Sequence, residues 1–184
     1  MSKTKVQEKT EQEQPSTEEM PQAPVCSIDA EAIRSSCLAV EMSPKQVAKL
    51  IKSVSPRCLQ AGELLLEEGH EEDTLYVVTE GQLEVVKSTG GGEWMSLQSL
   101  QPGDIVGVLG FFEGGGHSAT IRATTDCKLF GLRRKTFERM LKRWPSLDYK
   151  ITRAIVRNLH EIISRMNMQY VEMTNYINKQ HGRY

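Results

Sequence analysis

Apolar and polar side chains alternate in short runs between residues 57 and 132, and glycine-containing turns separate the runs. This period of two is typical of β-strands with one buried face, and glycine supplies turn conformations that other residues resist. A series of short strands in about 75 residues predicts a small antiparallel sandwich or barrel. The predicted strands are Leu64–Leu66, Leu75–Val78, Leu83–Val86, Trp94–Leu97, Ile105–Val106, Ala119–Ala123 and Lys128–Leu132.

A period near 3.6 residues precedes this region and indicates helices. Residues Ile28–Met42 predict a weakly amphipathic helix, with Asp29 as its N-cap. A second helix is predicted to begin at Ser43-Pro44, because a cap residue followed by proline is a common helix start. It should end at Ser55-Pro56, since the residue before a proline avoids the helical region.

The helical period returns after the predicted strands. Residues Phe137–Trp144 predict a short helix that Pro145 ends, and residues 146 to about 177 contain neither Gly nor Pro. A heptad pattern over this second stretch predicts a long coiled-coil-like helix. Its a positions are Thr152, Leu159, Met166 and Met173, and its d positions are Ile155, Ile162, Gln169 and Tyr176.

A helix of over 30 residues exceeds the diameter of a small barrel, so its far half should pack on a second copy. The alternative is packing along its own domain. The predicted dimer seam is Ile155, Leu159, Ile162, Met166 and Met173.

Residues 1–25 contain five Glu, three Lys and three Pro and no aromatic residue, which predicts a disordered tail. The expected organisation is this tail, a domain over 26–145 and a C-terminal helix over 146–184. No apolar run approaches the roughly 20 residues of a membrane helix, and no secretory signal follows the first residues. We therefore expect a cytoplasmic protein without membrane contact.

The cysteines are widely spaced, at positions 26, 37, 58 and 127, and no Cys-x-x-Cys pair occurs. This spacing predicts four reduced thiols, no disulfide and no metal site. The histidines at 70, 117, 160 and 181 are also isolated, and the chain has neither a P-loop nor a G-x-S-x-G motif. These patterns argue against an enzyme.

The formal net charge is −1, but the charges are segregated. Residues Glu63–Glu84 include eight acidic and no basic side chains, whereas Arg133–Arg143 include six basic and one acidic. The basic stretch is consistent with a helix face that docks an acidic partner or a phosphate backbone. The interpretation we favour is the solvated outer face of an amphipathic helix.

The order of these elements, together with several turn motifs, resembles the cyclic-nucleotide-binding domain over residues 43 to about 165. The motifs are Ala61-Gly62-Glu63-Leu64, Glu68-Gly69-His70, the run Leu75–Val85, and Leu100–Asp104. The resemblance implies an α+β, mainly β fold. It would be an antiparallel β-roll, or double-stranded β-helix of jelly-roll type, with N-terminal helices and a long C-terminal helix.

The resemblance also places a phosphate-binding cassette at Val106–Thr120. In the family a short helix begins at a glycine, a Glu accepts from the ribose, and an Arg grips the phosphate with two hydrogen bonds. Here Val108 and His117 stand at the Glu and Arg positions, and the purine-contacting positions of catabolite activators fall on Ile162-Ile163. The candidate pocket comprises Gly107, Leu109, Gly110, Phe111, His117, Ser118, Ala119 and Thr120.

The resemblance implies a dimeric regulatory module of the catabolite-activator type that acts in signal transduction through a protein partner. The seven residues after Ile177 are too few for a helix-turn-helix domain, so direct DNA binding is not expected. The ligand would be a cyclic nucleotide or another anionic small molecule. The alternative function is a ligand-free dimeric scaffold that uses the β-roll only as an interaction surface.

Overall fold

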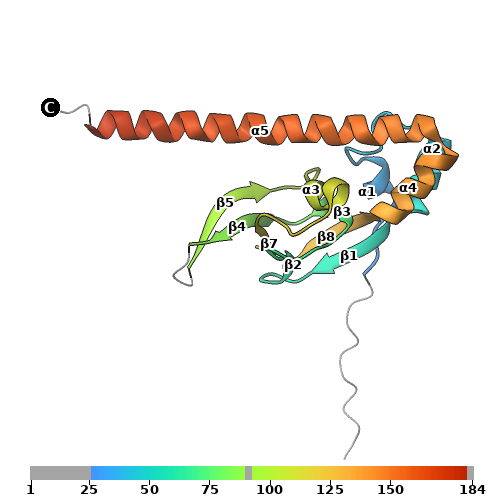
Figure 1. Ribbon diagram of the computed structural model, residues 1–184, viewed down its shortest axis with the longest axis horizontal. Helices are drawn as coiled ribbons and strands as arrows, with labels where there is room; N and C mark the ends of the chain where they lie inside the picture. The colour runs from blue at the N-terminus through green and yellow to red at the C-terminus, as the bar shows by residue number, and fades with distance from the viewer. Residues whose placement is uncertain (1–25, 90–92, 182–184) are drawn as a thin grey trace, which may run out of the picture.

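A computed structural model describes residues 26–89 and 93–181, and the predicted tail over 1–25 lies outside them. Two four-stranded antiparallel sheets form a β-roll, with helices at one end and one long helix across it (Figure 1). The predicted fold class is confirmed. One sheet has the order β1-β8-β3-β6 and the other β2-β7-β4-β5. The strands are β1 (Ser55–Leu59), β2 (Leu64–Leu66), β3 (Thr74–Glu80), β4 (Leu83–Ser88), β5 (Trp94–Leu100), β6 (Ile105–Val106), β7 (Thr120–Ala123) and β8 (Cys127–Arg133).

Strand β3 is buried on both faces and separates two hydrophobic cores. Leu75 and Val77 pack against the helices, whereas Tyr76 and Val78 face the other sheet. Successive side chains of a strand point to opposite faces, so one short strand serves both cores. None of the described helices is long and apolar enough to cross a membrane.

The lead-in contains less helix than the sequence predicts. Asp29 caps helix α1 as expected, but α1 ends at Arg34 (Ala30–Arg34) and turns replace the helix predicted through Met42. Ser35 and Ser36 donate their hydroxyls to backbone carbonyls of the preceding turn. Such serine contacts compete with continued helix, which accounts for the early end.

Helix α2 (Pro44–Ile51) begins at Ser43-Pro44 as predicted, and the Gln46 side chain accepts from the Ser43 amide at 2.9 Å. The chain then enters β1, a strand that the sequence pattern did not reveal. Pro56 was interpreted only as a helix stop. Because β1 is an edge strand, a proline without an N–H group is tolerated there.

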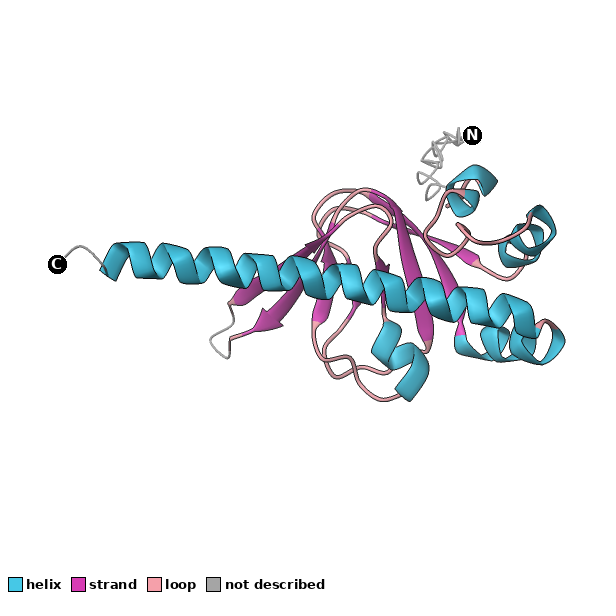
Figure 2. Ribbon diagram, turned by 90° about the horizontal axis from the view of Figure 1, so that it is seen from above, coloured by secondary structure: helices cyan, strands magenta, loops and turns pink. Residues whose placement is uncertain are grey.

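Three further helices complete the fold: α3 (Val108–Glu113), α4 (Arg134–Arg143) and α5 (Pro145–His181). Helix α4 ends at Arg143, one residue before the predicted end at Trp144, and Pro145 opens α5. Helix α5 has 37 residues, or roughly 55 Å, and extends past the β4–β5 hairpin (Figure 2).

Helix α5 is fastened to the turn between β5 and β6. The buried Asn158 amide accepts from Ile105 N–H at 3.0 Å and donates to the Gly103 carbonyl at 3.3 Å. About two turns further along, Arg165 pairs with Asp104 at 2.6 Å. The same turn leads through β6 into α3, so α5 contacts the segment that positions α3.

A second set of contacts joins α5 to the N-terminal helices. Lys150 donates to the Glu41 carbonyl at 2.6 Å, and Arg153 and Arg157 pair with the Glu41 carboxylate. The hydrogen bond from Arg157 is the main cause of a lowered pKa of Glu41. The first half of α5 therefore belongs to the domain, as the core residues Ile151 and Ala154 also show.

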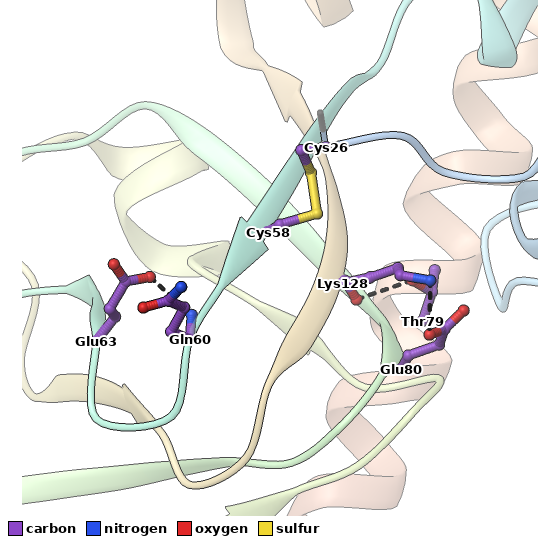
Figure 3. Close-up of a disulfide and its surroundings, with 7 residues drawn as sticks. All are labelled: Cys26, Cys58, Gln60, Glu63, Thr79, Glu80 and Lys128. Carbon is purple, nitrogen blue, oxygen red and sulfur yellow. Dashed lines mark hydrogen bonds and ion pairs between the residues drawn. A yellow bond between two sulfur atoms is a disulfide. The ribbon is translucent and has the colours of Figure 1, made fainter. Parts of the chain in front are cut away.

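Cys26 and Cys58 form a disulfide, which makes the prediction of four reduced thiols wrong (Figure 3). The segment before α1 lies across β1 and brings the two Cα atoms to 5.6 Å, although 32 residues separate them in sequence. Linear spacing carries no information about such proximity. Cys37 and Cys127 are free, and burial raises the pKa of both thiols, that of Cys37 to about 11.

Reduction of this disulfide should lower the free energy of unfolding by about 2–4 kcal/mol, because the crosslink restricts the unfolded chain. Urea unfolding with and without a thiol reductant measures the change. The variant Cys58→Ser should match the reduced protein and not respond to reductant. Free-thiol titration that finds all four cysteines reactive in the unreduced protein would contradict the assignment.

Candidate ligand-binding site

Gly107 links β6 to α3 and is required there for two reasons. Its φ of 80° lies in the left-handed region, and a Cβ at this position would lie 2.6 Å from the Thr74 carbonyl oxygen. Only glycine satisfies both conditions at low cost. The chain therefore passes from the buried strand β6 into a short helix within one residue, which places the first amides of α3 beside β3.

Gly110 lies on the face of α3 that meets His117. A Cβ on Gly110 would lie 2.6 Å from His117 Cε1 and 2.9 Å from the Glu72 carbonyl oxygen, so the imidazole packs directly on the helix backbone. The backbone of His117 is fixed by hydrogen bonds with His70 and Gly69. Its Nε2 is buried with no hydrogen-bond partner among the described residues.

Val108 occupies the position where the resemblance implies a ribose-binding Glu. It is 9% exposed and belongs to the core between the first sheet and the helices. A valine in that core can neither accept nor donate a hydrogen bond. The side chain at position 108 therefore offers a ligand no polar group.

The other candidate residues have different environments. Phe111 is fully buried, and its ring centroid lies 5.3 Å from that of Phe137 on α4. Thr120 is buried and its hydroxyl accepts from Glu68 N–H at 3.0 Å, so this group is already used inside the protein. Leu109 is 61% exposed. The Ser118 carbonyl accepts from Lys87 at 3.2 Å, and Ala119 is half-buried.

Arg134 contacts the cassette, although sequence reasoning did not select it. Its guanidinium donates to the Gly110 carbonyl and lies beside Gly114, and its Nε is buried without a described partner. A cavity of about 380 Å³ opens here, lined by Glu71, Glu72, Asp73, Gly110, Gly114, Gly115 and Arg134. In the sequence, Arg134 stands out only as part of the basic stretch Arg133–Arg143, which gave no link to the cassette.

Gln98 is a second residue that the sequence did not single out. It pairs with Val85 across β4 and β5, and Val85 pairs with Ile121 on β7. Paired residues share a face of the sheet, and Val85 and Ile121 pack in the core between the sheets. The Gln98 amide nitrogen is buried there with no hydrogen-bond partner among the described residues.

Two partly buried acidic side chains, Glu84 and Glu72, make contacts within the roll but not with the cassette. Arg122 donates twice to Glu84 across β4 and β7, and this hydrogen bonding is the main cause of the lowered pKa of Glu84. Burial, reinforced by a hydrogen bond to Glu72, raises the pKa of Tyr76 to about 12. Arg122 is thereby occupied by a protein carboxylate.

The predicted dimer seam divides between two environments on α5. Ile155 is buried in the core of its own chain, and Leu159 and Ile162 are half-buried. Met166 and Met173 are 51% and 57% exposed. A second row of apolar residues is spaced by three and four, and all of its members except the core-packed Leu159 are more than half exposed: Val156, Leu159, Ile163, Met166, Tyr170 and Met173.

Comparison with known proteins agrees with this geometry. Residues 56–143 match the model of the cyclic nucleotide-binding domain. The cAMP-activated global transcriptional regulator CRP of Salmonella typhimurium is 29% identical over 115 residues, which cover 61% of this chain and 55% of that protein. The chain thus spans about half the length of this curated relative.

Solved structures are similar over a larger share of the chain. The N-terminal domain of a transcriptional regulator from Streptomyces coelicolor A3(2) is 30% identical, with a TM-score of 0.61, covering 73% of this chain and 94% of that one. A cyclic nucleotide-binding domain from Methylobacillus flagellatus has a TM-score of 0.69 at 19% identity. The match covers 78% of this chain and 81% of that one. The chain belongs to the cyclic nucleotide-binding domain family, whose domains are regulatory.

Proposed function

We propose that this protein is a regulatory module whose phosphate-binding cassette no longer recognises a cyclic nucleotide through charged groups. The observation that carries the proposal is the replacement of both charged positions by residues already committed to packing: His117 against Gly110 and Val108 in the core. The cassette keeps its glycine-initiated helix, but neither a guanidinium fork nor a ribose-binding carboxylate occupies these two positions.

The loss is large in energetic terms. A hydrogen bond to a charged group contributes about 1.5–3 kcal/mol, so removing two of them weakens binding by roughly two to four orders of magnitude. The name of the Salmonella relative describes it as cAMP-activated. For the present chain we infer that cAMP and cGMP bind weakly and that another anionic small molecule is the effector.

Buried polar atoms favour a ligand over the alternative of a ligand-free scaffold. Gln98 and His117 each bury a nitrogen that lacks a partner among the described residues. Such atoms are rare in native proteins, because leaving one unsatisfied costs about 1–3 kcal/mol. A bound molecule that accepts from or donates to these nitrogens would remove the cost.

The contacts of α3 supply a route from the cassette to α5. Arg134 joins α3 to the start of α4, and Phe111 and Phe137 pack between the same two helices. On the other side, Asn158 holds the turn that leads into α3. We infer that a ligand which shifts α3 also shifts α5, and that partner proteins respond to α5.

Isothermal titration calorimetry with cAMP, cGMP and cyclic dinucleotides tests the proposal. Both mononucleotides should bind with dissociation constants above about 1 μM, and His117→Arg should tighten them about tenfold or more by restoring a forked donor. His117→Ala is the matched control and should give no gain.

Sub-micromolar binding of either mononucleotide to the unaltered protein would contradict the proposal. A thermal-shift screen separates the sensor from the scaffold, since a ligand that binds only the folded state raises the melting temperature. If no anionic compound in that screen raises the melting temperature, the ligand-free scaffold is favoured.

We further propose that a second copy of the chain packs on the exposed row of α5 defined above. A spacing of three and four over Val156 to Met173 is the pattern of a two-stranded coiled coil. The row shares Leu159, Met166 and Met173 with the seam predicted from sequence. Beyond Leu159 the residues of the row are all more than half exposed, whereas Ile155 is 2% exposed in the core of its own chain.

Replacing Met166 in this row by Glu should weaken self-association at least about tenfold. Burying an unpaired carboxylate in the interface is unfavourable, and a tenfold effect corresponds to about 1.4 kcal/mol of association free energy. Sedimentation equilibrium measures the effect. Met168→Glu is the matched control, since Met168 is 66% exposed but lies off the row. A monomeric parent protein, or equal effects of both substitutions, would contradict this arrangement.

A further inference from the structure

Helices α2 and α4 together form a basic surface at the end of the molecule away from the β4–β5 hairpin (Figure 1). A depression of about 370 Å³ lies between them, lined by Lys52, Ser53, Thr136, Arg139, Met140, Arg143 and Trp144. We call this depression and the adjoining Lys49 and Lys142 the α2–α4 surface. It combines five cations with two hydroxyl groups.

The cations of the α2–α4 surface make no ion pair with any carboxylate that the structure describes. Lys49 lies 4.1 Å from the centroid of the Trp144 ring, and Arg143 lies 5.2 Å from it. Arg139 donates only to Lys135 and Thr136 on its own helix. By contrast, basic residues of α5 and of the second sheet do pair with carboxylates, as at Glu41 and Glu84.

The disulfide fixes the place where the N-terminal segment meets the domain. Cys26 is bonded to Cys58, which lies five residues after Ser53 of the α2–α4 surface. Extended chain spans about 3.3 Å per residue, so this separation is at most about 17 Å. Residues that precede Cys26 by seven or more can therefore reach the surface.

The residues before Cys26 carry the complementary charge. Residues 10–25 contain four Glu, at positions 11, 13, 18 and 19, and neither Lys nor Arg. The groove beside the disulfide is lined by Glu63, Glu80 and Asp126, and its Lys128 is already paired with Glu80 at 3.0 Å (Figure 3). That groove repels an acidic segment, whereas the α2–α4 surface attracts one.

We propose that the acidic block of residues 10–25 docks on the α2–α4 surface of its own chain. Tethering at Cys26 gives the block a high effective concentration at the surface, so weak and salt-sensitive ion pairs are sufficient to hold it. The block thereby covers a basic face that an acidic segment of a partner protein would otherwise occupy. Docking does not depend on occupancy of the ligand site around α3.

Zero-length carbodiimide crosslinking of the full-length chain tests the proposal, because it joins only carboxylates and amines in direct contact. Mass spectrometry should find Glu11, Glu13, Glu18 or Glu19 joined to Lys49 or Lys52 at low salt. The yield should fall about fivefold or more in the variant Arg139→Glu/Arg143→Glu. This variant keeps Lys49 and Lys52 for crosslinking but removes the ion pairs that the two arginines would make with the acidic block. It should fall similarly at about 0.5 M salt, where screening is strong.

The double variant Arg34→Glu/Lys179→Glu is the matched control. It changes the net charge equally but alters α1 and the far end of α5, so the crosslink yield should not change. Equal losses in both double variants would overturn the proposal, as would crosslinks to Lys49 and Lys52 that persist unchanged at high salt.

A second measurement uses fluorescein-labelled poly-glutamate as a competing acidic probe. Replacing Glu11, Glu13, Glu18 and Glu19 by Gln in the full-length chain should strengthen probe binding about fivefold, because the surface is then uncovered. Equal probe binding by the parent and the Gln variant would show that an external acidic partner, and not the chain's own block, is the occupant.

Discussion

The attachment of α5 to the turn before β6 is the constraint on which the rest of the molecule depends. Asn158 is a buried amide on an otherwise apolar face, and both of its polar atoms are satisfied by the backbone of Gly103 and Ile105. An apolar residue there would leave a buried N–H and carbonyl unpaired. The amide therefore fixes both the rotation of α5 and the path of the chain into Gly107.

In the function proposed above, the cassette has lost its charged groups and kept its backbone. Gly107 and Gly110 are still required, the first by its positive φ and the second by the close approach of His117. Both requirements concern packing and not a ligand. The glycines therefore report on the fold, and the side chains at Val108 and His117 determine ligand choice only in the function proposed above.

Much of the fold could be predicted from the sequence, because alternation and glycine turns report local geometry directly. Seven of the strands and the start of α2 were found in this way. Strand β1 was missed because Ser55-Pro56 has no strand-like composition. The first helix was predicted to be too long, because hydrophobic spacing does not show that Ser35 and Ser36 bond to backbone carbonyls and end the helix. The disulfide was missed because it depends on tertiary proximity alone.

The candidate site was located by its glycines and by the resemblance, but its chemistry was only partly predicted. Gln98 and Arg134 lie outside the cassette, on strand β5 and at the start of α4, so no pattern within the cassette points to them. The heptad pattern likewise could not distinguish the face of α5 that meets its own domain from the face that remains exposed. Ile155 and Val156 are neighbours in sequence, but Ile155 is buried whereas Val156 is 60% exposed.

Hydrogen–deuterium exchange of Asn158→Ala, compared with the exposed Asn175→Ala, tests the link between α5 and the cassette most directly. Loss of the Asn158 amide should raise exchange together in residues 101–113 and in the first half of α5, while exchange in β4 and β5 stays unchanged. Increased exchange confined to α5, with residues 101–113 as protected as in the parent protein, would contradict the coupling of α5 to α3.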